Sequence, residues 1–130
     1  MPAPVTVAPA ATIAPPLLDP FPVVRIRGLL TRGGARVTLL SVRAPRGTRI
    51  AAACFGRSCP VRRLARASLR TRLRPFDRLL AAGTRLEIRV TKPGFVGKWT
   101  TIVIRRKSEP WRRDRCVQPG ARRPGRCPTV

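Results

Sequence analysis

Histidine and tyrosine are absent from this chain, and carboxylates are scarce, with only 5 Asp and Glu residues. Without histidine, the side chain that most often transfers protons near neutral pH is missing, so general acid–base catalysis has few candidates. The serines have no base to activate them, and no phosphate-binding glycine loop precedes an evident helix. The sequence therefore predicts a protein that is not an enzyme and that uses no cofactor.

Long apolar runs are also missing. No stretch approaches the roughly 20 apolar residues that a transmembrane helix needs, so we expect no transmembrane segment. The first 22 residues hold 7 of the 15 prolines and no Lys or Arg, which predicts a Pro-rich flexible linker over residues 1–22. No basic n-region precedes its weakly apolar part, so this stretch does not indicate an export signal.

Positive charge dominates what is present. The chain has 28 Lys and Arg residues and a formal net charge of +23, so few cations can pair with a carboxylate of the same chain. Most of them must face water or an anionic partner. GC-rich codons explain part of the excess of Arg over Lys, but they explain the shortage of carboxylates less well.

Arginine alternates with apolar residues, as in the Arg-Leu-Glu-Ile-Arg-Val sequence of residues 85–90. Successive side chains of a β-strand point to opposite faces of a sheet, so this period predicts half-buried strands with outward cations. We expect an all-β domain over residues 23–105, followed by a basic tail over residues 106–130. The expected strands cover residues 23–30, 36–43, 48–54, 68–74, 85–91 and 98–105.

The second of these strands changes phase. Val37 and Leu39 fall on one face, whereas Leu40 and Val42 fall on the other. This pattern predicts either a β-bulge or a strand that is buried on both faces.

Residues 61–74 fit either of two structures. Their apolar residues also suit one face of a helix between two prolines, and such a helix would be basic and amphipathic, as at membrane surfaces or on nucleic acid. We prefer a strand over Ser68–Arg74, because Leu69, Thr71 and Leu73 alternate strictly.

The 4 cysteines form two close pairs, Cys54 with Cys59 and Cys116 with Cys127. Each short loop contains glycine, so we favour these pairs as disulfides, each worth about 2 to 3 kcal/mol of stability. A structural zinc site and free thiols are the alternatives. The second spacing is far from the roughly two to four residues of a zinc knuckle and histidine is absent, so we expect no metal. Disulfides would place the protein outside the cytoplasm, in the extracellular space or the cell envelope.

A Gly-Thr corner at Gly83-Thr84 leads into residues 85–91, and a turn with two glycines joins these to residues 98–105. This arrangement resembles the final hairpin of bacterial immunoglobulin-like and fibronectin-like sandwiches. The resemblance implies a small immunoglobulin-like sandwich of roughly six or seven strands. The tyrosine often seen after such a corner is absent, and Leu86 is expected to fill its space.

Several further motifs follow one another over about residues 20–128. They are Pro20–Ile26, Arg43–Gly47, Cys54–Pro60, the corner hairpin and the tail Asp114–Pro128. Their order and spacing are similar to those of small cysteine-bearing domains in predicted secreted proteins of GC-rich actinobacteria. The resemblance implies no activity.

Two stretches are the most basic. Residues 57–78 hold 8 Arg and one acid, and residues 110–130 hold 6 Arg and one acid. Because guanidinium groups bind phosphate and carboxylate in a bidentate manner, we expect a noncatalytic extracellular or envelope interaction module. Its expected partners are anionic envelope polymers or other polyanions. The candidate polyanion-binding residues are Arg62, Arg63, Arg66, Arg70, Arg72, Arg74, Arg112 and Arg113.

A cytoplasmic, nonspecific nucleic-acid-binding protein is the second interpretation, because a pI near 12.0 matches the electrostatic character of such proteins. With only 4 Phe and 2 Trp, stacking on single-stranded bases is weakly provided for. A membrane-surface protein is the third, and it depends on the helical alternative for residues 61–74. A solvated basic face with no cognate partner is the plainest alternative.

Overall fold

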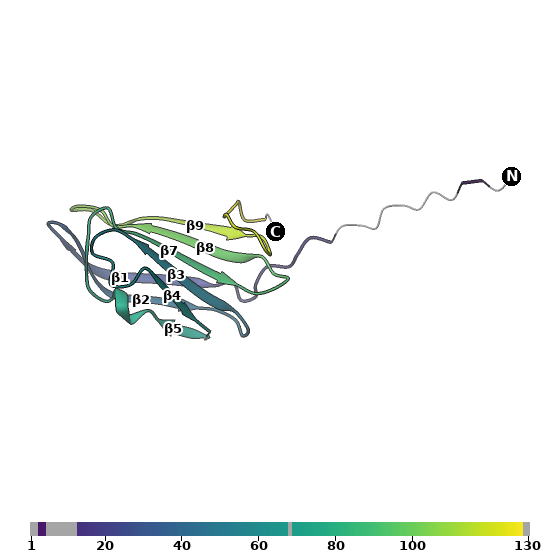
Figure 1. The fold of residues 1–130 in the computed structure, drawn as a ribbon, viewed down its shortest axis with the longest axis horizontal. Helices are drawn as coiled ribbons and strands as arrows, with labels where there is room; N and C mark the ends of the chain where they lie inside the picture. Colours follow the sequence, from purple (N-terminus) through teal and green to yellow (C-terminus); the bar gives the residue numbers. More distant parts are fainter. Residues whose placement is uncertain (1–2, 5–12, 68, 129–130) are drawn as a thin grey trace.

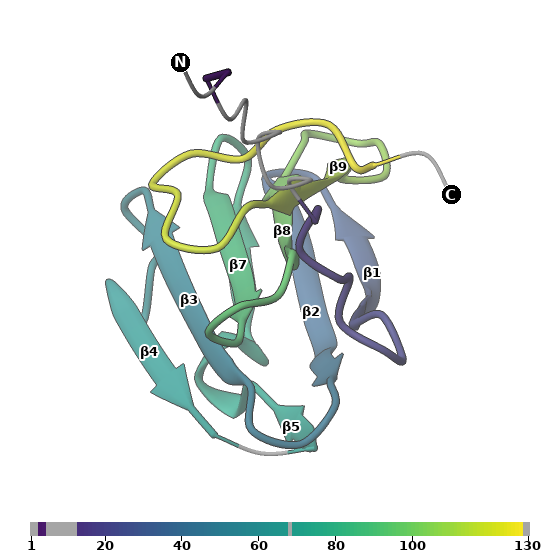
Figure 2. The same ribbon diagram turned by 90° about the vertical axis from the view of Figure 1, so that its right-hand side faces the viewer.

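The computed structural model describes residues 3–4, 13–67 and 69–128 of the chain, and within these ranges nine strands form two antiparallel sheets. The sheets pack face to face as a β-sandwich (Figures 1 and 2). The first sheet contains β1 (Val23–Thr31), β2 (Gly34–Arg43), β5 (Arg70–Arg72) and β6 (Leu79–Ala81). The second sheet has the order β4 (Arg63–Arg66), β3 (Arg49–Phe55), β7 (Arg85–Thr91), β8 (Gly97–Val103) and β9 (Trp111–Val117). The all-β prediction is therefore confirmed.

The hydrophobic core lies between the sheets and uses alternate residues of the strands. In β7, Leu86, Ile88 and Val90 are buried, and the charged residues between them face outward. In β3, Ile50 and Cys54 are buried in the same way. The two-residue period thus separates an apolar interior from two charged outer faces.

β2 contains the irregularity that its sequence predicts. Gly28 pairs with Val37 and Arg27 pairs with Leu39, which leaves Thr38 as an extra residue in β2. The apolar residues on both sides of this β-bulge can therefore face the core.

The segment after β3 differs from both of the expected structures. β4 is a strand where the alternative predicted a helix, and β5 covers only Arg70–Arg72 of the strand expected over Ser68–Arg74. Ser68 itself lies outside the described residues. The strand ends early because Pro75 has no N–H for a ladder and lies in η1 (Arg74–Phe76), a short 3₁₀ helix that buries Phe76.

The sandwich has more strands than the six or seven expected, because β4, β6 and β9 were not predicted. β4 and β6 contain only 4 and 3 residues, too few to show a period. In β9, charged residues on both faces hide the alternation. β9 lies within the range 106–130, expected as a basic tail, and pairs with β8 along its whole length.

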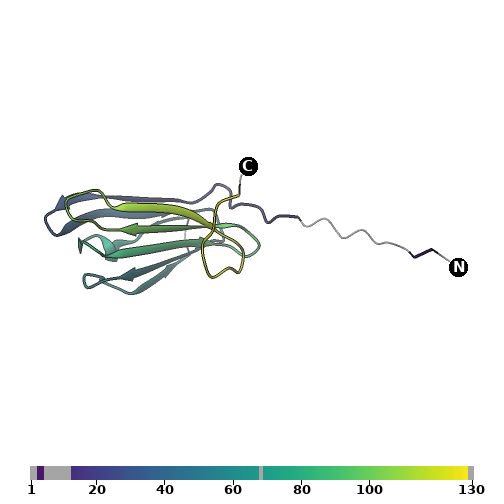
Figure 3. The same cartoon turned by 90° about the horizontal axis from the view of Figure 1, so that it is seen from above.

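The last residues before β1 also join the fold. Leu17 forms a parallel bridge with Val96, and Leu18 is only 2% exposed in the core. The range 1–22, expected as a flexible linker, therefore ends in residues that pack on the sandwich. Figures 1 and 3 show that the chain enters at the same end where the segment after β9 folds back.

The Cys54–Cys59 disulfide closes the loop that follows β3. Within this loop, the Ser58 hydroxyl accepts a hydrogen bond from the Ala81 amide at 2.9 Å and lies 2.9 Å from the Thr84 hydroxyl. Ala81 ends β6 of the first sheet, and Thr84 precedes β7 of the second. The Cys54–Cys59 bridge therefore holds Ser58 where it links the two sheets at the Gly-Thr corner. The tyrosine often seen at such a corner is absent from this chain.

Asp114 of β9 accepts hydrogen bonds at the edge of the second sheet, near the segment that precedes β1. The Thr100 hydroxyl donates to its Oδ1 at 2.7 Å and the Arg112 Nε donates to its Oδ2 at 2.8 Å. Lys98 Nζ lies 3.5 Å from Asp114 Oδ1 and donates to the Pro22 carbonyl at 3.0 Å. Burial raises the pKa of Asp114, but these donors and positive charges outweigh it and lower the pKa from 3.8 to about 2.

Because the folded-state pKa of Asp114 is lowered, its stabilising contribution is present above the unfolded pKa and is lost as the pH falls towards 2. We expect Asp114→Asn to reduce the free energy of unfolding by about 1 kcal/mol near neutral pH, a figure reduced for partial exposure of the carboxylate. The difference from wild type should shrink between about pH 5 and pH 2. Urea unfolding across this range measures it, with the exposed Glu109→Gln as control. A difference that does not change with pH would contradict the role of Asp114.

Candidate anion-binding groove

The outer face of the second sheet brings together arginines from three strands. Arg49 of β3, Arg63 of β4 and Arg89 of β7 all occupy outward positions, because the residues that alternate with them are turned to the core side. In the register of the sheet, Arg63 lies opposite Ala53 and Arg89 lies opposite Ala51. The arginines therefore stand on both sides of the small side chains of β3.

These small side chains form the floor of a groove on the sheet surface. Ala51, Ala53 and Ala65 line it, with Phe55 among the other lining residues, and its volume is about 530 Å³. Larger outward residues at these positions would fill the space between the arginines. We call this hollow the alanine groove.

Two further hollows adjoin the alanine groove. The end hollow, about 810 Å³, lies between the β2–β3 turn and the end of β4. The loop hollow, about 520 Å³, lies between the β7–β8 turn and the segment after β9. Arg49 lines all three hollows, which we together call the basic groove. The cations that line the basic groove are Arg46, Arg49, Arg63, Arg66, Arg89 and Lys92.

No carboxylate is among the described residues that line the basic groove. Arg46, Arg49 and Arg63 make no side-chain hydrogen bond or ion pair with any described residue. Arg89 is positioned by Trp99, since its guanidinium lies 4.3 Å from the centre of the indole ring. Trp99 is only 7% exposed, so it supports Arg89 rather than offering a free stacking surface.

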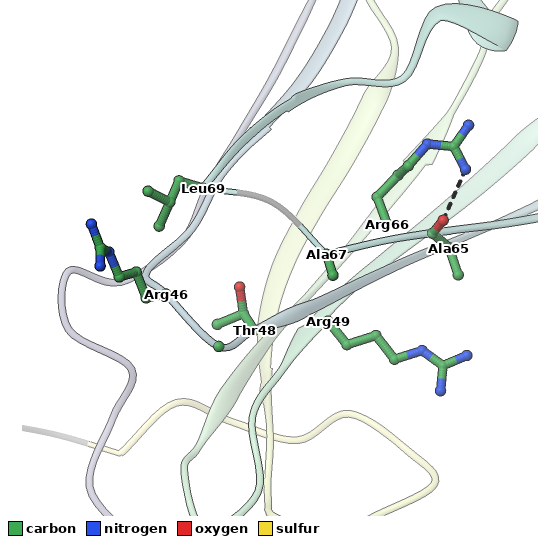
Figure 4. A pocket seen from close by; sticks show the side chains of 8 residues that line it. Arg46, Thr48, Arg49, Ala65, Arg66, Ala67 and Leu69 are labelled. Carbon is green, nitrogen blue, oxygen red and sulfur yellow. Dashed lines mark hydrogen bonds between the residues drawn. The ribbon is translucent and has the colours of Figure 1, made fainter.

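The guanidinium groups around the end hollow do not converge on one point. Figure 4 shows Arg46 on one side near Leu69 and the side chains of Arg49 and Arg66 on the other, each directed differently. The Arg66 guanidinium donates to the Ala65 carbonyl at 2.8 Å. The arrangement therefore offers separate cations along a surface, not a closed pocket for one small anion.

The structure brings only two of the sequence-predicted residues, Arg63 and Arg66, to the basic groove. Arg70 and Arg72 lie in β5 of the other sheet, and the Arg112 guanidinium is bonded to Asp114. The remaining predicted residues are Arg62 before β4, Arg74 in η1 and Arg113 in β9.

Sequence reasoning missed four of the groove cations, Arg46, Arg49, Arg89 and Lys92. The alternation over residues 85–90 already predicted that Arg89 faces outward, as Arg49 of β3 also does in the structure. It did not indicate that β7 pairs with β3, and this pairing is what places the two arginines beside the same alanines.

The segment after β9 forms one wall of the loop hollow through Gln118 and Ala121. Cys116 and Gly125 exchange two backbone hydrogen bonds at 3.0 and 2.7 Å, and the Cys116–Cys127 disulfide closes the same loop. The pairing of all four cysteines is the sequential one that the sequence favoured. Two such bridges indicate an oxidising, extracytoplasmic location.

The described ranges, residues 3–4, 13–67 and 69–128, contain neither a candidate metal site nor a membrane-spanning helix. No group of three or more His, Cys, Asp or Glu side chains in these ranges could hold a metal ion. No helix there is long and apolar enough to cross a membrane. Comparison with protein-family models, curated proteins and solved structures finds no match to this chain.

Removing the Cys116–Cys127 bridge should make the segment after β9, which lines the loop hollow, more mobile. We expect the double variant Cys116→Ser/Cys127→Ser to lose about 2 to 3 kcal/mol of unfolding free energy. We also expect trypsin to cleave the folded protein faster after Arg122 and Arg126, which are not followed by proline. Limited digestion followed by mass spectrometry measures this cleavage. The matched control is Cys54→Ser/Cys59→Ser, which should leave cleavage at these two sites slow; equal cleavage in both variants would contradict the local role of the Cys116–Cys127 bridge.

Proposed function

We propose that this protein is a noncatalytic interaction module that binds anionic polymers along the basic groove. The observation that carries the proposal is a set of three hollows that share Arg49 and are lined by six cations, with no carboxylate among their described residues. Each guanidinium can bind a phosphate or carboxylate through two parallel hydrogen bonds. The unpaired state of Arg46, Arg49 and Arg63 supports the proposal, because no internal partner has to be displaced.

The spacing of the cations favours a polymer over a single small anion. With strands about 4.8 Å apart and alternate residues about 6.8 Å apart, the Arg49 and Arg89 backbones are about 8 Å from each other and those of Arg63 and Arg89 about 12 Å. Arginine side chains could bridge such backbone separations, but those of Arg46, Arg49 and Arg66 are directed apart in Figure 4 and do not surround one small anion. A chain that carries repeated phosphate or carboxylate groups can contact several of them in turn.

The proposed setting is the extracellular space or the cell envelope, where the partners would be phosphate- or carboxylate-bearing envelope polymers. The two disulfides support this setting and weigh against a cytoplasmic nucleic-acid-binding protein, because cytoplasmic thiols are kept reduced.

The family likeness is also part of the proposal. The order β1-β2-β5 with β6 in one sheet, and β4-β3-β7-β8 in the other, supports a fibronectin-like sandwich to which β9 adds an edge strand. The Gly-Thr corner supports the same likeness: Gly83 has a φ of 91°, and its amide donates to the Ile104 carbonyl at 2.8 Å. A cysteine-bearing secreted module of this kind accords with two bridges and a basic binding face.

The groove arginines can be tested together. We expect Arg46→Gln/Arg49→Gln/Arg63→Gln to weaken binding to long-chain polyphosphate, because three unpaired cations are lost. The slope of log affinity against log salt should become shallower by about 2 to 3. Fluorescence titration over a salt series measures both quantities, and alginate in place of polyphosphate distinguishes carboxylate from phosphate binding.

A matched control removes the same charge from the far end of the sandwich. Arg32, Arg105 and Arg106 are exposed, and we find no side-chain partner for them in the described part of the chain. The variant Arg32→Gln/Arg105→Gln/Arg106→Gln should bind more tightly than the groove variant at every salt concentration. Equal weakening would show that net charge alone binds the polymer, and unchanged binding by the groove variant would exclude the basic groove.

The alanine floor provides a test that leaves the charge unchanged. We expect Ala53→Phe to reduce polyphosphate affinity, because the ring occupies the alanine groove between Arg63 and β7 while an outward aromatic residue remains compatible with the strand. Ala53→Ser keeps a small side chain and should bind like wild type. Thermal melts establish that both variants are folded; wild-type affinity in a folded Ala53→Phe protein would place the polymer elsewhere.

A further inference from the structure

The outer face of the first sheet carries a second hollow lined by arginines. Arg25 of β1 and Arg72 of β5 lie on either side of Ser41 of β2, and Arg43 lies beside Arg70. These residues line a hollow of about 390 Å³ that contains no carboxylate among its lining residues. We call this surface the second face.

The cations of the second face differ in how they are engaged. The Arg72 guanidinium is held by Asp77 at 2.8 Å and also donates to the Thr38 carbonyl at 2.9 Å. For Arg25, Arg43 and the neighbouring outward Arg27, we find no side-chain hydrogen bond or ion pair within the described ranges. Arg25 and Arg43 of the second face, together with Arg27 beside it, are therefore available to an external anion.

The second face and the alanine groove lie on opposite sides of the sandwich, whereas Arg46 of the end hollow lies in the turn that connects the two sheets, three positions after Arg43. The side chains that alternate with Arg25 and Arg43, namely Val24 and Val42, are buried in the core, as are Ile50 and Ile88 from the other sheet. Figure 2 shows β1 and β2 on one side and β3 and β7 on the other. The sheets are about 10 Å apart, so the guanidinium groups of Arg63 and Arg89 are about 20 Å from those of Arg25 and Arg27 once side-chain lengths are added.

This separation makes the two faces electrostatically independent. At physiological salt the screening length is about 8 Å, so an anion bound on one face does little to neutralise the other. We infer that the protein is bivalent for polyanions, with one anionic chain on each face, and that it crosslinks anionic polymers. The inference rests on the proposed function of the basic groove and adds a second binding site to it.

The experiment has two readouts. Calorimetric titration with polyphosphate chains too short to reach both faces gives the number of sites per protein. Light scattering with beads that carry long-chain polyphosphate reports crosslinking. We compare wild type with the groove variant, with a second-face variant, Arg25→Gln/Arg27→Gln/Arg43→Gln, and with the Arg32/Arg105/Arg106 control, each of which removes three charges.

Wild type and the control should show two sites and aggregate the beads. The groove variant and the second-face variant should each show one site, coat the beads and fail to aggregate them. One site in wild type, abolished in the groove variant, would overturn the second site and leave the proposed function standing. No binding in wild type would overturn both. Two remaining sites in a folded second-face variant would also overturn the assignment to Arg25, Arg27 and Arg43.

Discussion

The two-residue period of the β-strand is the constraint on which the rest of this structure depends. With 28 cations and 5 carboxylates, the chain can bury few charges as ion pairs, and burying an unpaired charge is costly. Alternation solves this by sending one side chain inward and the next outward along each strand. The same period that builds the core from Leu86, Ile88 and Val90 therefore covers both outer faces with arginine.

The chain has few carboxylates, and two of them, Asp114 and Asp77, hold cations at particular places in the fold. Asp114 joins β8, β9 and the segment before β1 through Lys98, and Asp77 holds Arg72 beside β5. The two disulfides also stabilise local structure. One holds the loop of Ser58, which links the two sheets, and the other closes the loop that lines the loop hollow. Because these contacts engage only some of the cations, other arginines stay available to external anions.

Small residues shape the proposed binding surface as much as the cations do. Three alanines with short side chains leave a hollow on the outer face of β3 and β4. Three longer arginine side chains surround this hollow. The alanines are Ala51, Ala53 and Ala65, and the arginines are Arg49, Arg63 and Arg89. Trp99 lies beneath Arg89, and the cation–π contact between them orients the guanidinium. Binding by a groove of this kind would depend on repeated charge and on shape, with little dependence on the identity of the polymer.

The sequence by itself determined the all-β class and β7, because both follow from a local period. It favoured the sequential disulfide pairing from the short loops, and it indicated the β-bulge in β2 as one of two alternatives. It did not indicate β9, where arginine occupies both faces, or the early end of β5 at η1. Only the tertiary structure decided which arginines meet: Arg49 and Arg89 are 40 positions apart in the printed numbering and become neighbours only when β3 pairs with β7. Such pairing is set by packing between distant strands, which a local period does not specify.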